Sequence, residues 1–192
     1  PFCYHIDQFE SLRPVFMKVI EYSNAMGLDM IQGDHEDAPG QLELNWTFDN
    51  VLRNADRLST YRQICAQVAR EHGLIACFMT KPFMGVSASG CHTNMSLWKG
   101  GKISVNKLGH KSLPGVDEVF SYVSGGKNTF MPDTKDPQLP GKIGLQSIAG
   151  IMKHLPALTA LGSSTVNSYR RLWDQGFWAP VYADWGYQNR TC

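Results

Sequence analysis

A tight turn between two acidic segments constrains this chain more than any other feature. Pro39 and Gly40 form a dipeptide in which proline presets φ at the first corner and glycine accepts a positive φ at the second. After the turn, apolar residues alternate with polar ones over residues 42–48, which is the pattern of a half-buried strand. We therefore predict an antiparallel hairpin folded about Pro39 and Gly40.

This hairpin brings together two glutamates whose charges repel. Folding about the turn is expected to place Glu36 directly opposite Glu43, with Cβ atoms about 4.5–5.5 Å apart. Carboxylates this close repel unless a cation lies between them or one is protonated. Hard divalent cations bind such carboxylates, so the pair indicates a metal site. An ordinary solvated hairpin is the alternative interpretation of the same spacing.

A second polar pattern follows the small-residue loop at residues 87–90. His92, Asn94 and Ser96 alternate with other side chains, which predicts a strand over residues 86–98 with these three on one face. An imidazole, an amide and a hydroxyl in a row suit a metal ligand followed by phosphate or nucleotide contacts. A structural histidine is the alternative for His92 taken alone.

Two further positions carry arginines. Arg171 closes the run Asn-Ser-Tyr-Arg-Arg at residues 167–171, and Arg190 ends a polar stretch that begins at Trp185. Guanidinium groups offer planar forks that match carboxylate and phosphate. Surface arginines are common, so this spacing alone is weak support for a binding site.

Composition narrows the class of protein. The chain has 192 residues, 43% of them hydrophobic, which predicts one sizeable core. A net charge of +1 excludes strong attraction to nucleic acid or to a membrane surface. No apolar run is long enough to span a bilayer and no signal peptide is expected. The five cysteines lack CxxC spacing, which predicts free thiols in a reducing cytoplasm.

Periodicity predicts alternating helices and strands. Strand hairpins alternating with long helices predict an α+β fold with a curved antiparallel sheet and flanking helices. Residues 99–141 are rich in Gly, Lys, Pro and Ser, which predicts a long irregular excursion. Helices are expected over residues 8–26, 49–72 and 145–161, and the first of them is expected to be regular only from Pro14 onward. Strands are expected over residues 28–34 and 74–80, in addition to those over 42–48 and 86–98.

Together these segments resemble the catalytic domain of the glutamine synthetase family, whose fold is also described as guanido-kinase-like. They occur in the family's order and cover nearly the whole chain; the subgroup with most similarity contains atypical bacterial glutamine synthetases and γ-glutamyl-amine ligases. The matching segments are residues 35–43, 78–82, 89–92, 148–154, 167–172 and 189–190.

The resemblance implies that residues 1–192 are part of that catalytic domain. Family members also have an N-terminal β-grasp domain and a further C-terminal part, which bear additional glutamates and arginines. Neither is present here, so a piece of a longer protein is expected. The family forms homo-oligomers of stacked rings, dodecamer-like, in the cytoplasm, with active sites shared between subunits; no nucleic acid or membrane partner is implied.

The implied activity is ATP-dependent amide formation. The γ-carboxylate of L-glutamate is phosphorylated by ATP, and ammonia then displaces phosphate from γ-glutamyl phosphate to give glutamine. Mg²⁺ or Mn²⁺ bridges the phosphates and neutralises their charge. An enzyme that uses methylamine, ethylamine or a polyamine instead of ammonia is one alternative, and a non-catalytic scaffold of the same fold is another.

The resemblance also assigns residues. Glu36 and Glu43 would share one metal ion and His92 would bind a second. Arg171 would act in catalysis and hold the α-carboxylate of glutamate, and Arg190 would neutralise the transferred phosphoryl group beside the nucleotide. The remaining contacts fall on Ser87 and Ala88 for glutamate, and on Asn94, Met95 and Ser96 for the nucleotide.

Three positions depart from the pattern of ammonia-using members. The glutamate loop has Ser87 and Ala88 in place of Asn and Gly, and Asn94 replaces a second histidine. Trp178 replaces the acidic residue that precedes Ala-Pro and captures ammonium. An indole takes no proton but can hold an alkyl chain or an ammonium group, so Trp178 is expected to contact the substrate and favours the organic-amine alternative. Retained metal ligands argue against the scaffold.

Overall fold

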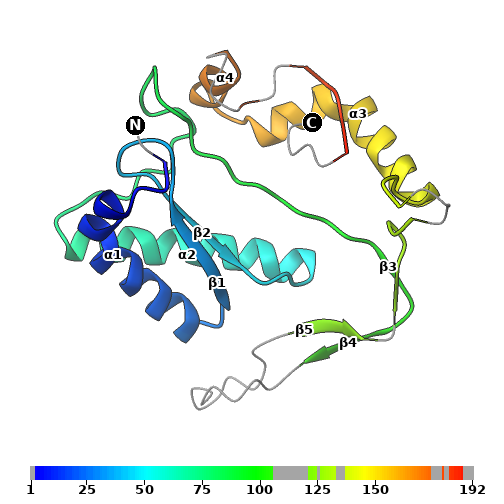
Figure 1. The fold of residues 1–192 in the computed structure, drawn as a ribbon, viewed down its shortest axis with the longest axis horizontal. Helices are drawn as coiled ribbons and strands as arrows, with labels where there is room; N and C mark the ends of the chain where they lie inside the picture. The colour runs from blue at the N-terminus through cyan, green and yellow to red at the C-terminus, as the bar shows by residue number, and fades with distance from the viewer. Residues whose placement is uncertain are drawn as a thin grey trace. The chain divides into compact units, whose positions relative to one another are not determined.

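The computed structural model describes residues 3–105, 121–124, 126–132, 137–173, 179 and 182–187 (Figure 1). Helices and antiparallel strand pairs follow one another, β1 with β2, β3 with β6 and β4 with β5, as an α+β fold requires. The elements are α1 Ile6–Ala25, β1 Met30–His35, β2 Leu42–Trp46, α2 Val51–Glu71, β3 Trp98–Lys99, β4 Lys102–Val105, β5 Ser121–Ser124, β6 Lys127–Asn128, α3 Lys142–Gly162 and α4 Val166–Trp173.

The chain divides into two compact units. The first unit comprises residues 1–78 and 102–124, and the second unit comprises residues 79–101 and 125–192. In the first unit, helices α1 and α2 pack with the β1–β2 hairpin around Val19, Ile64 and Val68. This small apolar cluster is what holds the acidic hairpin against its helices.

Helix α1 runs through Pro14, whereas the sequence predicted a regular helix only from that residue onward. Proline removes one backbone donor and would favour a break. The helix continues through Pro14 because apolar residues on both sides of the proline pack on the same face. The rings of Phe9 and Phe16 meet edge to face with centroids 4.8 Å apart, and Phe16 is buried.

Helix α2 lies close to its predicted range, and its buried stripe departs from the prediction only in the first turns, since Tyr61, Cys65 and Val68 pack in the core as expected. The side chain of Asn50 caps its first turn by accepting a hydrogen bond from the Arg53 N–H at 2.9 Å. The helical period predicts that Leu52 begins the buried stripe, but this side chain is 71% exposed. The helix instead buries Arg57 along with apolar residues further on, because the start of the helix faces a polar network.

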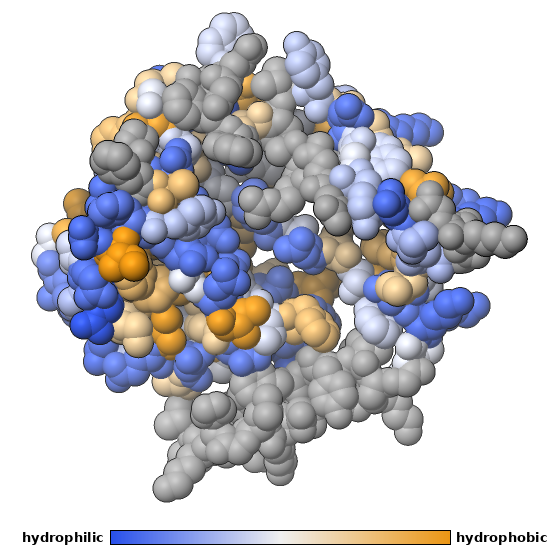
Figure 2. Space-filling view, viewed as in Figure 1, coloured by the Kyte–Doolittle hydropathy of each residue, from blue (hydrophilic) through white to orange (hydrophobic). Residues whose placement is uncertain are grey.

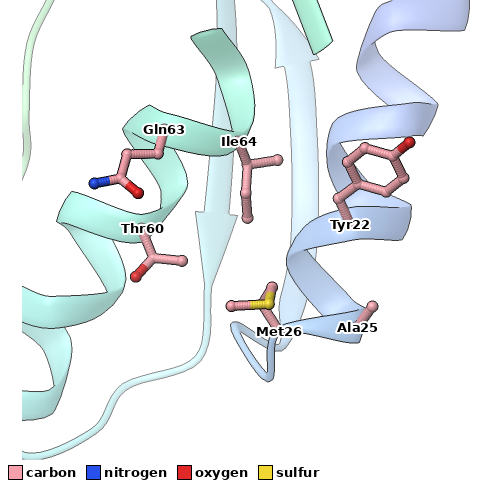
Figure 3. A pocket seen from close by; sticks show the side chains of 6 residues that line it. All are labelled: Tyr22, Ala25, Met26, Thr60, Gln63 and Ile64. Atoms are coloured by element: carbon pink, nitrogen blue, oxygen red, sulfur yellow. The ribbon is translucent and has the colours of Figure 1, made fainter. Parts of the chain in front are cut away.

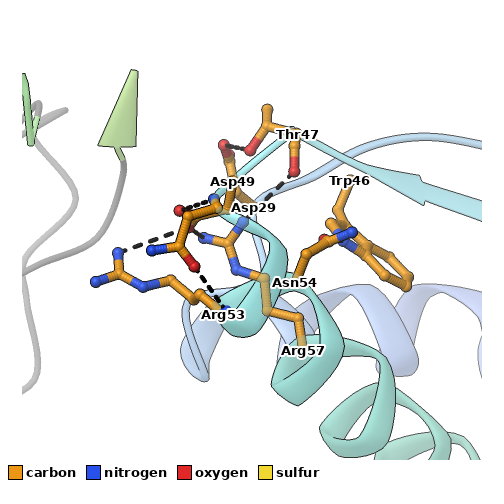
Figure 4. A network of polar contacts seen from close by, with 8 residues as sticks. Asp29, Trp46, Thr47, Asp49, Arg53, Asn54 and Arg57 are labelled. Atoms are coloured by element: carbon orange, nitrogen blue, oxygen red, sulfur yellow. Dashed lines mark hydrogen bonds and ion pairs between the residues drawn. The ribbon is translucent and has the colours of Figure 1, made fainter. Parts of the chain in front are cut away.

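That network joins the end of β2 to α2 (Figure 4). Asp49 forms an ion pair with Arg57 at 3.1 Å, and both side chains are almost fully buried. Arg57 also donates to the Thr47 carbonyl at 3.4 Å, and the Thr47 hydroxyl donates to the Asp29 carboxylate. Burial lowers the pKa of Arg57, and the charge of Asp49 opposes this shift.

The strands predicted over residues 74–98 differ from those that the structure contains. Residues 74–97 form turns and extended segments, and neither the strand expected over residues 74–80 nor the one expected over 86–98 is present. A strand needs a neighbour for its backbone groups, and among the described residues only β3 finds one there, in β6. Residues 99–141, predicted to be irregular, contain the strand pair β4–β5 and most of the pair β3–β6, which begins at Trp98.

Burial is also distributed differently from the single sizeable core that composition predicted. Among the described residues, every buried apolar side chain lies in the first unit, whereas the buried side chains of the second unit are polar. Many large apolar groups remain exposed, as the orange areas among blue ones in Figure 2 show. The buried polar side chains of the second unit are Lys81, Ser87 and Ser168.

The helices complete the second unit. Helix α3 begins three residues before its predicted start and continues past Pro156. Helix α4 was not predicted as a helix, although the sequence had singled out residues 167–172 for their arginines. Of the helices that the structure describes, none is both long and apolar enough to cross a membrane.

Replacing Arg57 with methionine tests the network. Methionine keeps the apolar stem but leaves the Asp49 carboxylate buried without its nearest cation, so we expect a loss of about 3–5 kcal/mol in the free energy of unfolding. Urea denaturation measures this loss. Arg53→Met is the matched control, because Arg53 lies 3.6 Å from the same carboxylate with 37% of its side chain exposed, and we expect it to lose less than about 1 kcal/mol. Equal losses would contradict the assignment.

Candidate functional site

The hairpin register corrects one prediction about the acidic pair. Asp34, and not Glu36, lies opposite Glu43. The Glu36 N–H donates to the Gln41 carbonyl at 2.8 Å, and the Gln41 N–H donates to the Ala38 carbonyl at 3.0 Å. The loop is therefore four residues long, with Gly40 at φ +73°, because a type II turn does not match the twist of a two-residue hairpin loop.

The shift in register is an even number of residues, so it leaves the acidic side chains on one face. Asp34, Glu36 and Glu43 share that face because side chains alternate along a strand. Glu36 and Glu43 are now diagonal neighbours, a separation that long side chains bridge. Asp34 was missed in the sequence, although its spacing of two from Glu36 on a strand was a sufficient signal.

The electrostatics of Glu36 show that the carboxyl groups interact. Burial raises the pKa of Glu36 above its ordinary value, and a hydrogen bond with Glu43 raises it further. The charges of Glu43 and Asp34 act in the same direction, while the Asp37 N–H, 3.2 Å from the carboxylate, opposes them. A hydrogen bond between two carboxyl groups needs a proton, and a bound cation would replace that proton.

Neighbouring amides hold two of these carboxylates in place. Asn45 donates to Glu43 at 3.1 Å, and Gln32 donates to Asp34 at 2.9 Å. The charge of Glu36 is the largest cause of a raised pKa at the Tyr4 hydroxyl. Oxygen donors of this kind suit Mg²⁺ or Mn²⁺. In the described part of the chain, no three His, Cys, Asp or Glu side chains come together as a metal site.

A second cluster forms around Gly90 in the second unit. A Cβ atom built on Gly90 would lie 3.1 Å from Nε2 of His92 and 3.6 Å from Nη2 of Arg171. Because Gly90 has no side chain, the imidazole of His92 and the guanidinium of Arg171 can both lie close to its backbone. These two predicted site residues come from distant parts of the sequence, and the structure brings them together.

Arg171 is suited to bind an anion. Its side chain is half-buried, which lowers the pKa of the guanidinium; an arginine remains charged at neutral pH nonetheless. Within the residues that the structure describes, its Nε is buried and has no hydrogen-bond partner. A buried donor without a partner is unfavourable by about 1–3 kcal/mol, which a bound carboxylate would relieve.

The other predicted contacts divide into two groups. Ser87 is buried and Ala88 half-buried in the loop that leads to Gly90, whereas the segment over residues 91–97 is exposed and extended. Within that segment, Ser96 accepts a hydrogen bond from Trp98 Nε1 at 3.0 Å. Asn94 and Met95 also lie there; Trp178 and Arg190 lie outside the described residues.

A surface pocket of 340 Å³ lies elsewhere in the first unit (Figure 3). Side chains of α1 and α2 face each other across it. None of the predicted site residues and no charged side chain lines it, so it lacks the groups that phosphoryl transfer requires. Its lining consists of Tyr22, Ala25, Met26, Thr60, Gln63 and Ile64.

Comparison with known proteins identifies the class to which this fold belongs. The family model for the glutamine synthetase catalytic domain matches residues 2–113 and 115–192. The chain therefore belongs to the glutamine synthetase family, as the sequence motifs indicated. Solved structures agree: a GmaS/ADP complex matches with a TM-score of 0.77 at 30% identity, covering 98% of this chain and 39% of that one. The predicted fold class is thereby confirmed.

Individual relatives include enzymes with different acceptors. A glutamine synthetase of Rhizobium leguminosarum bv. phaseoli is 35% identical over 98% of this chain and 39% of its own length. A glutamate–methylamine ligase of Methyloversatilis universalis is 32% identical over 98% of this chain and 38% of its own length. The chain thus spans about two-fifths of the length of these relatives.

Replacing Glu36 with glutamine tests the acidic face. An acid whose pKa is raised by folding contributes stability below its unfolded value of 4.5 and loses it as the pH rises through the folded value. In chelator at pH 7.5 we therefore expect Glu36→Gln to unfold about 1–3 °C above the wild type. Excess Mn²⁺ should reverse the order, because only the wild type keeps both carboxylates of the predicted metal site.

Differential scanning calorimetry at both metal conditions measures the effect. The matched control is Glu21→Gln, since Glu21 forms only an exposed ion pair with Lys18 at 3.1 Å. It should respond to Mn²⁺ as the wild type does. The assignment of Glu36 to a metal site would be contradicted if Glu36→Gln melts below the wild type in chelator. It would also be contradicted if Mn²⁺ raises the melting temperature of both proteins equally.

Proposed function

We propose that this protein forms an amide bond on the γ-carboxylate of L-glutamate at the expense of ATP, with ammonia as the acceptor. The observation that carries the proposal is the cluster at Gly90. A half-buried guanidinium with an unused donor faces an imidazole there, beside the loop that holds Ser87 and Ala88. This combination suits an anionic substrate close to a metal ion.

In this proposal Arg171 holds the α-carboxylate of glutamate. Its planar fork accepts a carboxylate in two parallel hydrogen bonds, and half-burial strengthens them because less water competes. The loop at Ser87 and Ala88 supplies the remaining contacts to the amino acid. Glutamate is then oriented with its γ-carboxylate away from Arg171.

The phosphoryl chemistry depends on divalent cations, as is usual for the family. Glu36 and Glu43 would hold one ion through carboxylate oxygens and His92 would hold another through its ring nitrogen, a mixed set that Mn²⁺ or Mg²⁺ accepts. Such ions supply neutralisation of phosphate charge when bound. On the protein side, Asn94, Met95 and Ser96 would contact the nucleotide, and Arg190 would stabilise the transferred group.

An organic amine is the second candidate acceptor. Trp178 stands where ammonia-using members have an acid, and an indole face binds an alkylammonium group well. A relative named as a glutamate–methylamine ligase matches nearly the whole chain. Methylamine, ethylamine and polyamines are the members of this class that we would test.

Assembly into stacked rings of identical subunits in the cytoplasm is part of the proposal. Val51, Ile75 and Trp173 are 84–91% exposed in the structure, and apolar groups exposed to this extent favour contact with further protein. The family's ring architecture offers such contacts between subunits. A scaffold without catalysis would keep the rings but would have no use for Arg171 beside His92.

The decisive measurement is glutamate-dependent phosphate release from ATP by the intact protein with Mg²⁺ or Mn²⁺. We expect ammonium to support faster release than methylamine, ethylamine or putrescine. Trp178→Glu should increase the preference for ammonium at least several-fold by providing a proton acceptor, whereas Trp178→Phe should not.

Each contrary result has a definite meaning. A wild-type preference for an alkylamine would establish the second candidate and make Trp178 a specificity residue. An unchanged preference in Trp178→Glu would remove Trp178 from the acceptor site. No release with any acceptor, in assembled protein that binds no ATP, would favour the scaffold.

A further inference from the structure

The side chain of Asn167 joins α4 to the loop that carries the predicted glutamate contacts. The Asn167 amide makes two hydrogen bonds to the backbone of Lys81: Oδ1 accepts from its N–H and Nδ2 donates to its carbonyl, both at 2.7 Å. The two residues are 86 positions apart in the sequence. The amide thus satisfies both backbone groups of Lys81, as a neighbouring strand would.

The loop that Asn167 holds is itself braced. Lys81 is only 2% exposed, and its ammonium donates to the Val86 carbonyl at 2.5 Å, across the loop. The Ser89 N–H donates to the Thr80 carbonyl at 2.8 Å, which closes the loop at its base. A restraint applied at Lys81 is therefore transmitted to residues 87–90.

Hydrogen bonds rather than apolar packing define this contact. The Thr80 hydroxyl lies 3.1 Å from that of Ser168, next to the Asn167 clamp. In the described part of the second unit, the buried side chains are polar, with Lys81 and Ser168 among them. Without an apolar core at this point, loss of the clamp leaves two backbone groups to find other partners.

The same helix carries the guanidinium of the proposed site. Asn167 and Arg171 are four residues apart on α4, so they lie on one face, about 6 Å apart along the axis. Asn167 contacts one end of the loop at Lys81, and Arg171 reaches its other end at Gly90. The clamp therefore fixes the distance between Arg171 and the loop.

We propose that Asn167 is a positioning residue. Its amide clamp on Lys81 fixes the position of Arg171 relative to Ser87 and Ala88 and so determines the affinity for glutamate. This inference rests on the proposed function. It predicts a defect in glutamate use that leaves nucleotide use nearly intact, because the clamp acts on the loop and the helix that hold the amino acid.

Asn167→Asp in the intact protein is the first test. Aspartate keeps the acceptor for the Lys81 N–H but replaces the donor with a charge that repels the Lys81 carbonyl. We expect the KM for glutamate to rise about tenfold or more, with the KM for ATP changed less than about twofold. Asn54→Asp is the control: it keeps the acceptor that Trp46 Nε1 uses at 2.7 Å in the first unit and should leave both constants unchanged.

A double-mutant cycle tests whether the effect passes through Arg171. Asn167→Ala and Arg171→Lys are measured singly and together, and alanine avoids the added charge. If Asn167 acts by placing Arg171, the double variant raises the KM for glutamate by less than the product of the single effects. Multiplicative effects would overturn the positioning role.

Hydrogen exchange gives a readout apart from turnover. Residues 80–92 should exchange faster in Asn167→Ala, while α2 keeps its wild-type protection. If the wild type is active but the Asn167 variants show unchanged hydrogen exchange or an unchanged KM for glutamate, the positioning role alone is overturned. A wild type with no glutamate-dependent release overturns the proposed function, and with it the role of Asn167 in glutamate affinity.

Discussion

Backbone donors and acceptors without a neighbouring strand have to be paired by side chains, and this constraint shapes the second unit. The amide of Asn167 pairs both backbone groups of Lys81, and the Lys81 ammonium pairs the Val86 carbonyl. Because these bonds are directional, they fix geometry more tightly than apolar contact does. The Gly90 cluster, where His92 and Arg171 meet, is built on this framework.

Burial of neighbouring carboxyl groups has the corresponding role in the first unit. The hairpin holds Glu36 near Glu43 and Asp34, and burial, followed by these neighbouring carboxyl groups, raises its pKa. The Asp49–Arg57 ion pair holds the end of β2, the strand that carries Glu43. A cation at the proposed site would relieve the repulsion between these carboxylates, so metal binding would be linked to stability.

Much of the local structure could be predicted from the sequence. The helices around residues 8–26 and 49–72 and the turn at Pro39 and Gly40 follow from periodicity and turn chemistry, and the ordered motifs were enough to indicate the family. The hairpin register, the exposure of the first turn of α2 and the missing strands over residues 74–97 could not be predicted, because each depends on neighbours that periodicity does not specify.

The sequence by itself therefore determined which residues are proposed to carry the chemistry and on which face of the hairpin the acids lie, since an even shift in register preserves the face. Tertiary structure alone decided that Asn167 meets Lys81 and that Arg171 meets Gly90. The physical reason is separation along the chain: alternation and helical period act over a few residues, whereas these contacts close long loops whose partners only packing and hydrogen bonding can select.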